Sequence, residues 1–234
     1  MAKLKYRKLR QEIIQTCLDM NRLGINQGTS GNVSARVADG FLITPSGIPY
    51  EELKPKQIVF MDLEGGYHGE WLPSSEWRMH MDVYKHKPEA EAVVHTHSVY
   101  ATAQSTLRED VPAFHYMIGC TGGNTLRCAR YATFGTAQLS NAMLKALEQR
   151  TACLLANHGA IMFGPNLKKT LWLAGEIETL CKQYFAAWQL GEPTILSAAE
   201  MKRVLARFKS YGKQAHELQP GDAPAVESPV RRDS

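Results

Sequence analysis

Two histidines separated by one residue, His95 and His97, follow the apolar segment Ala92-Val93-Val94. The segment predicts a strand, on which side chains at positions i and i+2 leave by the same face, so both imidazoles can reach one point. Neutral imidazole is a preferred ligand of zinc, and three histidines that leave one position open form a catalytic pattern. A pair of strand histidines can also be held by ordinary hydrogen bonds, so further ligands nearby are needed to indicate a metal site.

Two more residues could complete such a ligand set. His158 ends a second apolar segment, and Gly159 after it lets the backbone approach a ligand closely. Glu76 stands at a predicted helix start, where an anionic oxygen in the first turn also suits the helix dipole. Without a metal, His158 would be a turn residue and Glu76 a plain helix cap. His80 lies one turn after Glu76 and can share its face, but the H-E-x-x-H pairing of metalloproteases is missing, so we interpret His80 as structural.

Small polar residues gather in three other segments: Thr29-Ser30-Gly31-Asn32, Ser46-Gly47 and Ser74-Ser75. Hydroxyls, amides and exposed backbone N–H groups suit a phosphate, most of all where two serines open a helix. None of the segments is a Walker loop or a G-x-G-x-x-G sequence, and each taken alone could be an ordinary turn.

The composition limits the class of protein. The chain has 234 residues, 44% hydrophobic and 21% charged, which is typical of one globular domain. Its net charge of +4 is far from the dense basic stripe of a nucleic-acid binder. We expect no membrane span, because no long apolar run occurs, and no signal peptide, because no apolar run follows the charged N-terminus. Five cysteines without a C-x-x-C pair indicate reduced thiols, so we expect a cytoplasmic protein.

Helix and strand patterns alternate along the chain. We expect helices over about residues 4–23, 77–86, 99–107, 136–149, 167–190 and 198–208, strands over 92–97 and 153–157, and a hairpin at Asp39-Gly40. A serine should cap the helix that begins after Pro73. The interleaved order predicts one α/β domain with a sheet between helical layers. We expect that domain over residues 1–216 and a flexible C-terminal tail over 217–234, where Pro, Asp, Glu, Ser and Arg dominate.

Six segments together make the chain recognisable: NQGTSGNVS (26–34), ITPSGIPY (43–50), LPSSEWR (72–78), VHTH (94–97), YATFG (131–135) and NHG (157–159). In this order they resemble the class II aldolase/adducin family, over about residues 5–212. The resemblance implies a three-layer α/β/α sandwich with a mainly antiparallel central sheet. It also implies one catalytic Zn²⁺ per subunit and a fourfold-symmetric homotetramer with active sites at the subunit interfaces. Neither nucleic acid nor a membrane is an expected partner.

The resemblance also implies roles for individual residues. His95, His97 and His158 would ligate the zinc together with Glu76, which would then leave the metal to act as base. Tyr116 from a neighbouring subunit would be the acid on the aldehyde side. The remaining implied contacts are those to the substrate phosphate, from Thr29, Asn32, Ser46, Gly47, Ser74 and Ser75, and those of the aldehyde pocket, from Phe134 and Tyr211.

The implied reaction is a retro-aldol cleavage of a phosphorylated ketose, a ketose 1-phosphate, without a Schiff base, to dihydroxyacetone phosphate and a small aldehyde such as L-lactaldehyde. L-fuculose 1-phosphate is the first expected substrate. The alternative is 5-deoxyribulose 1-phosphate or 5-(methylthio)ribulose 1-phosphate, from the salvage of nucleoside by-products.

Three other readings remain open at this point. Pentulose-phosphate 4-epimerases of the family carry aspartate at the position of Glu76, and an acidic residue just past the position of His115, where this chain has Tyr116. Both differences favour an aldolase. A non-catalytic adducin-like module would not need the three histidines. Outside the family, three histidines around an open zinc position could also activate water in a hydrolase.

Overall fold

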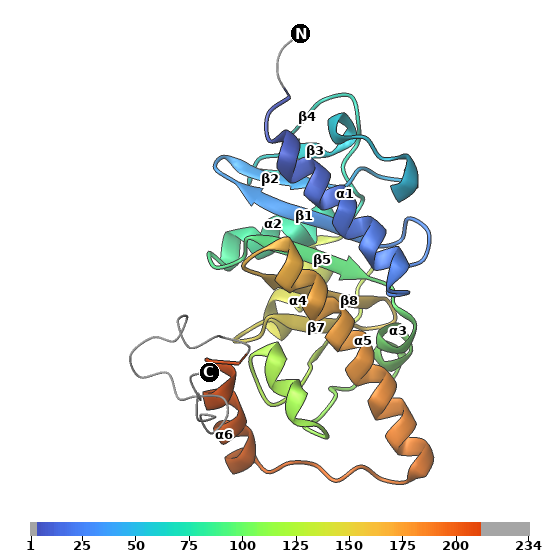
Figure 1. The fold of residues 1–234 in the computed structure, drawn as a ribbon, viewed down its shortest axis with the longest axis vertical. Helices are drawn as coiled ribbons and strands as arrows, with labels where there is room; N and C mark the ends of the chain where they lie inside the picture. Colours follow the sequence, from blue (N-terminus) through green and yellow to red (C-terminus); the bar gives the residue numbers. More distant parts are fainter. Residues whose placement is uncertain (1–3, 212–234) are drawn as a thin grey trace, which may run out of the picture.

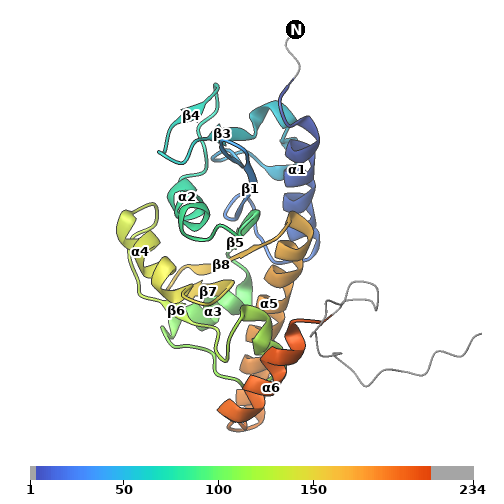
Figure 2. The same ribbon diagram turned by 90° about the vertical axis from the view of Figure 1, so that its left-hand side faces the viewer.

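Within residues 4–211, which the computed structural model describes, eight strands form one sheet and helices cover both of its faces (Figures 1 and 2). The strands are β1 (Asn32–Val37), β2 (Gly40–Ile43), β3 (Val59–Met61), β4 (Tyr67–His68), β5 (Ala92–Thr96), β6 (Cys128–Ala129), β7 (Ala152–Leu155) and β8 (Gly159–Gly164). The α-helices are α1 (Arg7–Arg22), α2 (Trp77–His86), α3 (Val99–Thr106), α4 (Ala137–Ala146), α5 (Leu167–Leu190) and α6 (Ala198–Phe208). Three short 3₁₀ helices complete the description: η1 (Tyr50–Glu52), η2 (Pro55–Gln57) and η3 (Tyr116–Thr121).

The strand order places β5 in the interior of the sheet. The order is β4-β3-β2-β1-β5-β8-β7-β6, and neighbouring strands are antiparallel except for the pair β6 and β7. On β5, His95 is opposite Asn32 of β1 on one side and opposite Ile161 of β8 on the other. The expected mainly antiparallel central sheet is confirmed.

Side chains that alternate along β5 enter two hydrophobic clusters, one on each face of the sheet. Ala92 and Val94 pack into the cluster that contains buried residues of α1 and α5, whereas Val93 packs with residues of α2 and α4. Figure 2 shows the same division, with α2 and α4 on one side of the sheet and α1 and α5 on the other. The three-layer α/β/α sandwich is confirmed, and the alternation directs His95 toward the layer that contains α2.

Most of the expected elements are present, with a few differences. The helices α5 and α6 have the predicted bounds, and their N-cap residues Asn166 and Ser197 each accept a hydrogen bond from a backbone N–H of the first turn. The strand β8, which pairs with β5 in the middle of the sheet, is not among the strands predicted from the sequence. The hairpin turns one residue earlier than predicted, because Val37 pairs with Gly40, which is already part of β2.

Several expectations concern the whole chain. All five cysteines are free, and three of them are buried. Within residues 4–211, no helix combines the length and the apolar character that crossing a membrane requires. The expected tail over 217–234 lies outside the described residues.

Candidate metal centre and its pocket

Three histidines from neighbouring segments converge at one end of the sheet. His95 lies near the end of β5, His97 follows the end of that strand, and His158 stands in the turn between β7 and β8. Each pair of rings has centroids 4.8 Å apart, and the ring planes lie at 75° to 80° to one another. The two segments singled out in the sequence therefore meet, and the predicted clustering of the three imidazoles is present.

Glu76 reaches the same point from the start of α2. It occupies the N-cap position, but its side chain makes no capping hydrogen bond and instead points at the imidazoles. Its Oε2 lies 3.0 Å from Nε2 of His95, and its Oε1 lies 3.0 Å from Nε2 of His158. The expected serine cap of this helix is wrong, since Ser74 accepts from the N–H of Glu76 rather than from the first turn of the helix.

The four side chains fit a divalent metal ion. One ligand atom from each of Glu76, His95, His97 and His158 can be chosen so that all four lie within 4.8 Å of one another. Oε1 of Glu76 is buried and, although Nε2 of His158 lies 3.0 Å away, it accepts no hydrogen bond of acceptable geometry, which is costly unless a cation binds there. Nδ1–H of His95 donates to the carbonyl of Ala160 at 2.9 Å, so its Nε2 lone pair points into the cluster, as in ligating histidines. Three imidazole nitrogens and one carboxylate oxygen form a donor set that suits a four-coordinate ion.

The electrostatics of the cluster favour the protonation states that a metal requires. Burial alone would raise the pKa of Glu76, but the nearby imidazoles of His95 and His158 outweigh it and lower that pKa. Burial would lower the pKa of His95, but the Glu76 carboxylate raises it. Burial and the neighbouring imidazoles lower the pKa of His97 to about 4. Glu76 is thus ionised and His97 neutral at pH 7, as metal ligands must be, whereas His95 would release its proton when a metal binds.

A pocket of about 450 Å³ opens beside this cluster. Glu76, His97 and His158 form part of its wall. Four residues expected to contact phosphate also line it, namely Thr29, Ser46, Gly47 and Ser75, and so does Phe134. Small polar side chains and a metal-type cluster therefore face one cavity.

Two other expected phosphate contacts have different positions. Asn32 is 3% exposed, and its Nδ2 donates to Oε2 of Glu76 at 3.0 Å. Ser74 is buried, and its Oγ accepts from the backbone N–H of Glu76. Neither residue lines the pocket. The structure therefore places both side chains behind Glu76 rather than on the cavity wall.

Tyr116 and Tyr211 lie away from the histidines of their own chain. Tyr116 begins η3, and Tyr211 follows α6, which packs against η3. Tyr211 lines a separate cavity together with Phe208 and Trp172. Neither tyrosine lines the pocket beside the histidines. A single chain thus supplies the metal cluster and the small polar residues without these two tyrosines.

Asn157 and Tyr131 line the pocket but were not expected as site residues. Asn157 has a positive φ of 53° and accepts a hydrogen bond from Nε of Arg108 at 2.7 Å, and the Arg108 guanidinium also lies over the Tyr131 ring. Asparagine tolerates this backbone conformation better than most residues. In the sequence, the position of Asn157 directly before His158-Gly159 is the feature that could have identified it as a pocket residue.

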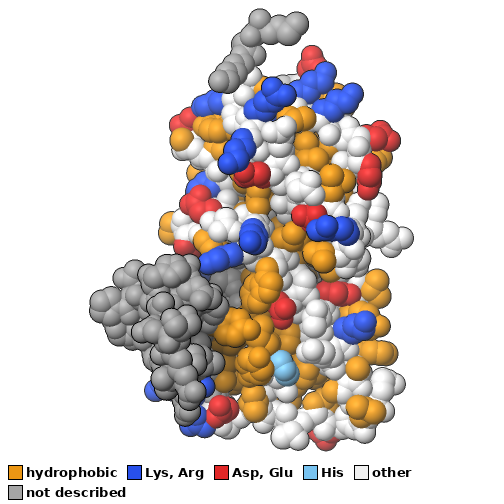
Figure 3. Space-filling view, viewed as in Figure 1, with side chains coloured by type: hydrophobic (Ala, Val, Ile, Leu, Met, Phe, Trp, Pro, Cys, Tyr) orange, Lys and Arg blue, Asp and Glu red, His pale blue; other side chains and the backbone are white. Residues whose placement is uncertain are grey.

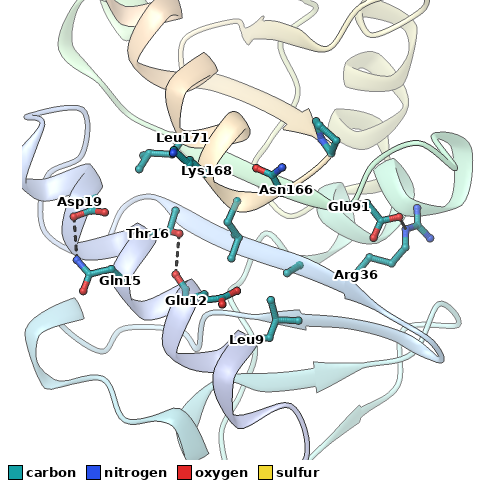
Figure 4. Close-up of a pocket in the computed structure, with 13 residues that line it drawn as sticks. Leu9, Glu12, Gln15, Thr16, Asp19, Arg36, Glu91, Asn166, Lys168 and Leu171 are labelled. Atoms are coloured by element: carbon teal, nitrogen blue, oxygen red, sulfur yellow. Dashed lines mark hydrogen bonds and ion pairs between the residues drawn. The ribbon is translucent and has the colours of Figure 1, made fainter. Parts of the chain in front are cut away.

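A larger pocket of about 580 Å³ lies between α1 and the start of α5 (Figure 4). It is lined by Glu12, Asp19 and Glu91, with Arg36 and Lys168 as cations. It contains no member of the histidine cluster, and the side chains of Glu91 and Arg36 lie near one another at its edge. We place the functional site at the smaller pocket, because the metal-type ligands open onto that one.

Comparisons with known proteins agree with this geometry. Residues 11–185 match the family described as Class II Aldolase and Adducin N-terminal domain. The chain is 52% identical over 211 residues to the L-fuculose phosphate aldolase of Escherichia coli (strain K12), which covers 90% of this chain and 98% of that protein. It is 50% identical over 207 residues to the 5-methylthioribulose-1-phosphate/5-deoxyribulose-1-phosphate aldolase of Rhodospirillum rubrum, covering 88% of this chain and 94% of that one.

The fold is also similar to a solved structure. A structure of an L-fuculose 1-phosphate aldolase superimposes with a TM-score of 0.84 at 40% sequence identity. The match covers 89% of this chain and 98% of the other.

Proposed function

The chain belongs to the class II aldolase and adducin family, and on that premise we propose that it is a zinc-dependent aldolase that cleaves a ketose 1-phosphate. The products would be dihydroxyacetone phosphate and a small aldehyde. One observation carries the proposal: the ligand cluster of Glu76 and three histidines opens onto the same pocket as the small polar residues Thr29, Ser46 and Ser75.

The pocket would orient the substrate by its phosphate. Thr29, Ser46 and Ser75 offer hydroxyl groups, and Gly47, at a φ of +70°, adds no side chain that would keep a phosphate away from the backbone. Binding the non-reacting end of the substrate holds the reacting carbons against Glu76 and the histidines, which lowers the entropic part of the barrier. The predicted phosphate roles of Asn32 and Ser74 find less support, since their side chains contact Glu76.

Glu76 would act as the proton carrier on the ketose side. Glu76, His95, His97 and His158 would hold a divalent ion, which would supply positive charge where negative charge develops on the substrate oxygens. In the direction of condensation, the ionised Glu76 would take a proton from the carbon of dihydroxyacetone phosphate that becomes C3, and Tyr116 would give its proton to the aldehyde oxygen as the C3–C4 bond forms. Cleavage would reverse both transfers, so the C4 hydroxyl proton returns Tyr116 to its neutral form while protonated Glu76 donates to C3. The buried, ionised carboxylate of Glu76 lies at the pocket wall, where such a transfer is possible.

Tyr116 would have to come from a second copy of the chain. In its own chain it is 47% exposed and does not line the histidine pocket. Figure 3 shows hydrophobic side chains gathered on the surface between α5 and α6. The exposed aromatic residues Trp172 and Tyr211 line one cavity between these helices, together with Phe208 of α6. We therefore propose a homotetramer with active sites at the subunit interfaces, in which Tyr116 and Tyr211 of one subunit contribute to the active site of its neighbour.

The substrate tail decides between two related activities. Phe134 and Tyr131 line the pocket and offer aromatic faces that bury a methyl group or a thioether well. L-fuculose 1-phosphate is the first proposed substrate, and 5-deoxyribulose 1-phosphate or 5-(methylthio)ribulose 1-phosphate is the second. The second has support of its own, because the relative from Rhodospirillum rubrum is 50% identical to this chain.

A panel of ketose 1-phosphates tests the proposal. The purified, zinc-loaded protein is incubated with each compound, and dihydroxyacetone phosphate is measured by a coupled reduction. We expect release from L-fuculose 1-phosphate and measurable release from 5-deoxyribulose 1-phosphate, because an apolar pocket separates such tails by only about 10- to 200-fold. Epimerisation of L-ribulose 5-phosphate without any release from either compound would contradict the aldolase.

The five free cysteines fit a reducing compartment, so we propose the cytoplasm as the location of the protein.

Zinc is the proposed metal because ligand sets of several histidines and one carboxylate are typical of catalytic zinc. Metal analysis of the protein as purified, followed by reconstitution of the stripped protein with Zn²⁺, Mn²⁺ or Co²⁺, would separate zinc from the other divalent ions. It would also exclude a module that binds no metal.

A further inference from the structure

We propose that His80 is a positioning residue that orients Glu76 through Asn32. The inference rests on the proposed role of Glu76 as metal ligand and proton carrier. His80 lies on α2, one turn after Glu76, and is fully buried. It contacts none of the three clustered histidines through a hydrogen bond described within residues 4–211, so any influence on the site passes through its hydrogen-bond partners.

A continuous line of buried hydrogen bonds connects Glu76 to Tyr84 of α2. Nδ2 of Asn32 donates to Oε2 of Glu76 at 3.0 Å, and Oδ1 of Asn32 lies 2.5 Å from Nε2 of His80. Nδ1 of His80 lies 2.6 Å from Oγ of Ser34, which lies 2.7 Å from the hydroxyl of Tyr84. All four supporting residues are at most 3% exposed.

The donors and acceptors in this line fit only one arrangement of protons. Because Asn32 uses Nδ2 to donate to the carboxylate, its Oδ1 must accept, so His80 carries its proton on Nε2. Nδ1 of His80 then accepts from the hydroxyl of Ser34, which in turn accepts from Tyr84. Burial lowers the pKa of His80 to about 3, which keeps the ring neutral, as this arrangement requires. Every proton in the line therefore points toward Glu76.

The direction matters because an amide can face a carboxylate in two ways. If Asn32 were turned over, its Oδ1 would meet Oε2 of Glu76, and two acceptors would repel one another. The N–H of His80 stabilises the other orientation, in which Asn32 donates. Glu76 makes no capping bond to its own helix, so Asn32 is its side-chain donor outside the ligand cluster. Hydrogen bonds to a ligating side chain set its orientation and basicity.

Zinc affinity tests the proposal without substrate. The metal-stripped protein is titrated with Zn²⁺ against a chromophoric chelator, and kcat and KM are then measured on L-fuculose 1-phosphate. We expect His80→Leu to weaken zinc binding by about 10- to 100-fold and to lower kcat in the same range, with KM nearly unchanged. His80→Gln should recover most of both values, because its amide nitrogen can still donate to Asn32.

The control separates positioning from a general loss of packing. Val83 is fully buried on the same helix and belongs to the hydrophobic cluster under α2. Val83→Ala should lower the Tm but leave zinc affinity at the wild-type value. If His80→Leu folds and binds zinc like the wild type, or if its affinity merely follows the Tm as in Val83→Ala, the proposal is overturned.

A second variant keeps the test usable if His80→Leu does not fold. Asn32→Leu removes the donor to Glu76 at similar volume, and wild-type zinc affinity in that variant would also overturn the proposal. The zinc-affinity measurements on the wild type and the variants test the role of His80 even if the protein cleaves no ketose 1-phosphate. Conversely, if His80→Leu binds Zn²⁺ and turns over substrate like the wild type, His80 does not position Glu76, and the aldolase proposal is unaffected.

Discussion

Gly159 lies so close to Thr96 across the β5–β8 pair that a Cβ atom at position 159 would overlap the carbonyl oxygen of Thr96. The same atom would lie 3.1 Å from Cδ2 of His97. The missing side chain thus lets the turn that carries His158 approach the end of β5, which carries the other two imidazoles. A close backbone approach, rather than a special φ angle, requires glycine here.

We expect Gly159→Ala to damage the metal centre and the fold together. The methyl group must push β8 away from β5, which separates His158 from His97, and such overpacking costs typically about 1–3 kcal/mol. Zinc content and the Tm should both fall. Gly175→Ala is the matched control, since a Cβ there meets nothing within 4 Å in α5 and should stabilise the helix. Full zinc content in Gly159→Ala would show that the close approach is not needed.

Each of His95→Ala, His97→Ala and His158→Ala should remove most bound zinc and nearly all turnover. The three ring centroids are equally spaced at 4.8 Å, so removal of any ring leaves a gap of the same kind. Metal analysis after gel filtration measures the effect. His68→Ala, at an exposed histidine on β4, is the control and should keep its zinc. A variant that retains both metal and activity would show that its histidine is not a ligand.

Glu76→Gln should keep the fold and much of the zinc but lose most turnover. An amide is nearly isosteric with the carboxylate but cannot carry the proton, and three imidazoles can still hold the metal. Loss of a general base typically lowers the rate by about 10²- to 10⁴-fold. The measurement is kcat at saturating substrate in zinc-loaded protein, with the exposed Glu64→Gln as the control. Wild-type turnover would mean that Glu76 has no role in proton transfer.

Acid should destabilise the metal-free protein partly through His80. The pKa of this ring is about 3 in the folded protein and 6.5 as a free side chain. Between these values the unfolded chain binds a proton that the folded chain does not, so stability falls as the pH drops below about 6.5. The contribution approaches about 1.4 kcal/mol per pH unit and vanishes above that window. Urea unfolding with a chelator present, at pH 6.5 and 5, should show a smaller loss in His80→Gln. Equal losses in the two proteins would show that His80 is not the group that titrates.

Mixed tetramers test the proposed contribution of Tyr116 across subunits. Tyr116→Phe and His95→Ala should each be nearly inactive alone. When the two variants are unfolded together and refolded, some sites combine an intact histidine cluster with an intact Tyr116 from the neighbour, so part of the turnover should return. Separately refolded variants mixed afterwards serve as the control. If co-refolded protein forms mixed tetramers without any recovery, Tyr116 does not act across the subunit contact.

Some elements of the fold can be predicted from the local sequence, whereas others depend on contacts with distant residues. The bounds of α5 and α6 agree with the prediction because apolar periodicity and the capping residues Asn166 and Ser197 are local signals. The strand β8 was missed because Gly159–Gly164 is a short apolar run between glycines, which periodicity cannot assign.

The position of Asn32 shows the same limit inside the site. Its segment of small polar residues correctly indicated a functional loop, and Thr29 does line the pocket. However, Asn32 is also the first residue of β1 and pairs with His95, which turns its amide toward Glu76. That register is set by residues more than sixty positions away, and no local pattern contains it.

The interior position of β5 has a consequence for how the metal can leave. His95 lies on a strand that is hydrogen-bonded on both sides, by β1 and by β8, so its backbone can open only when much of the sheet opens. Glu76 precedes a ten-residue helix and can move by side-chain rotation alone. Metal exchange is therefore expected to require only that this one carboxylate turns away from Asn32, while the backbone amide proton of His95 exchanges with solvent deuterium only on the timescale of global unfolding.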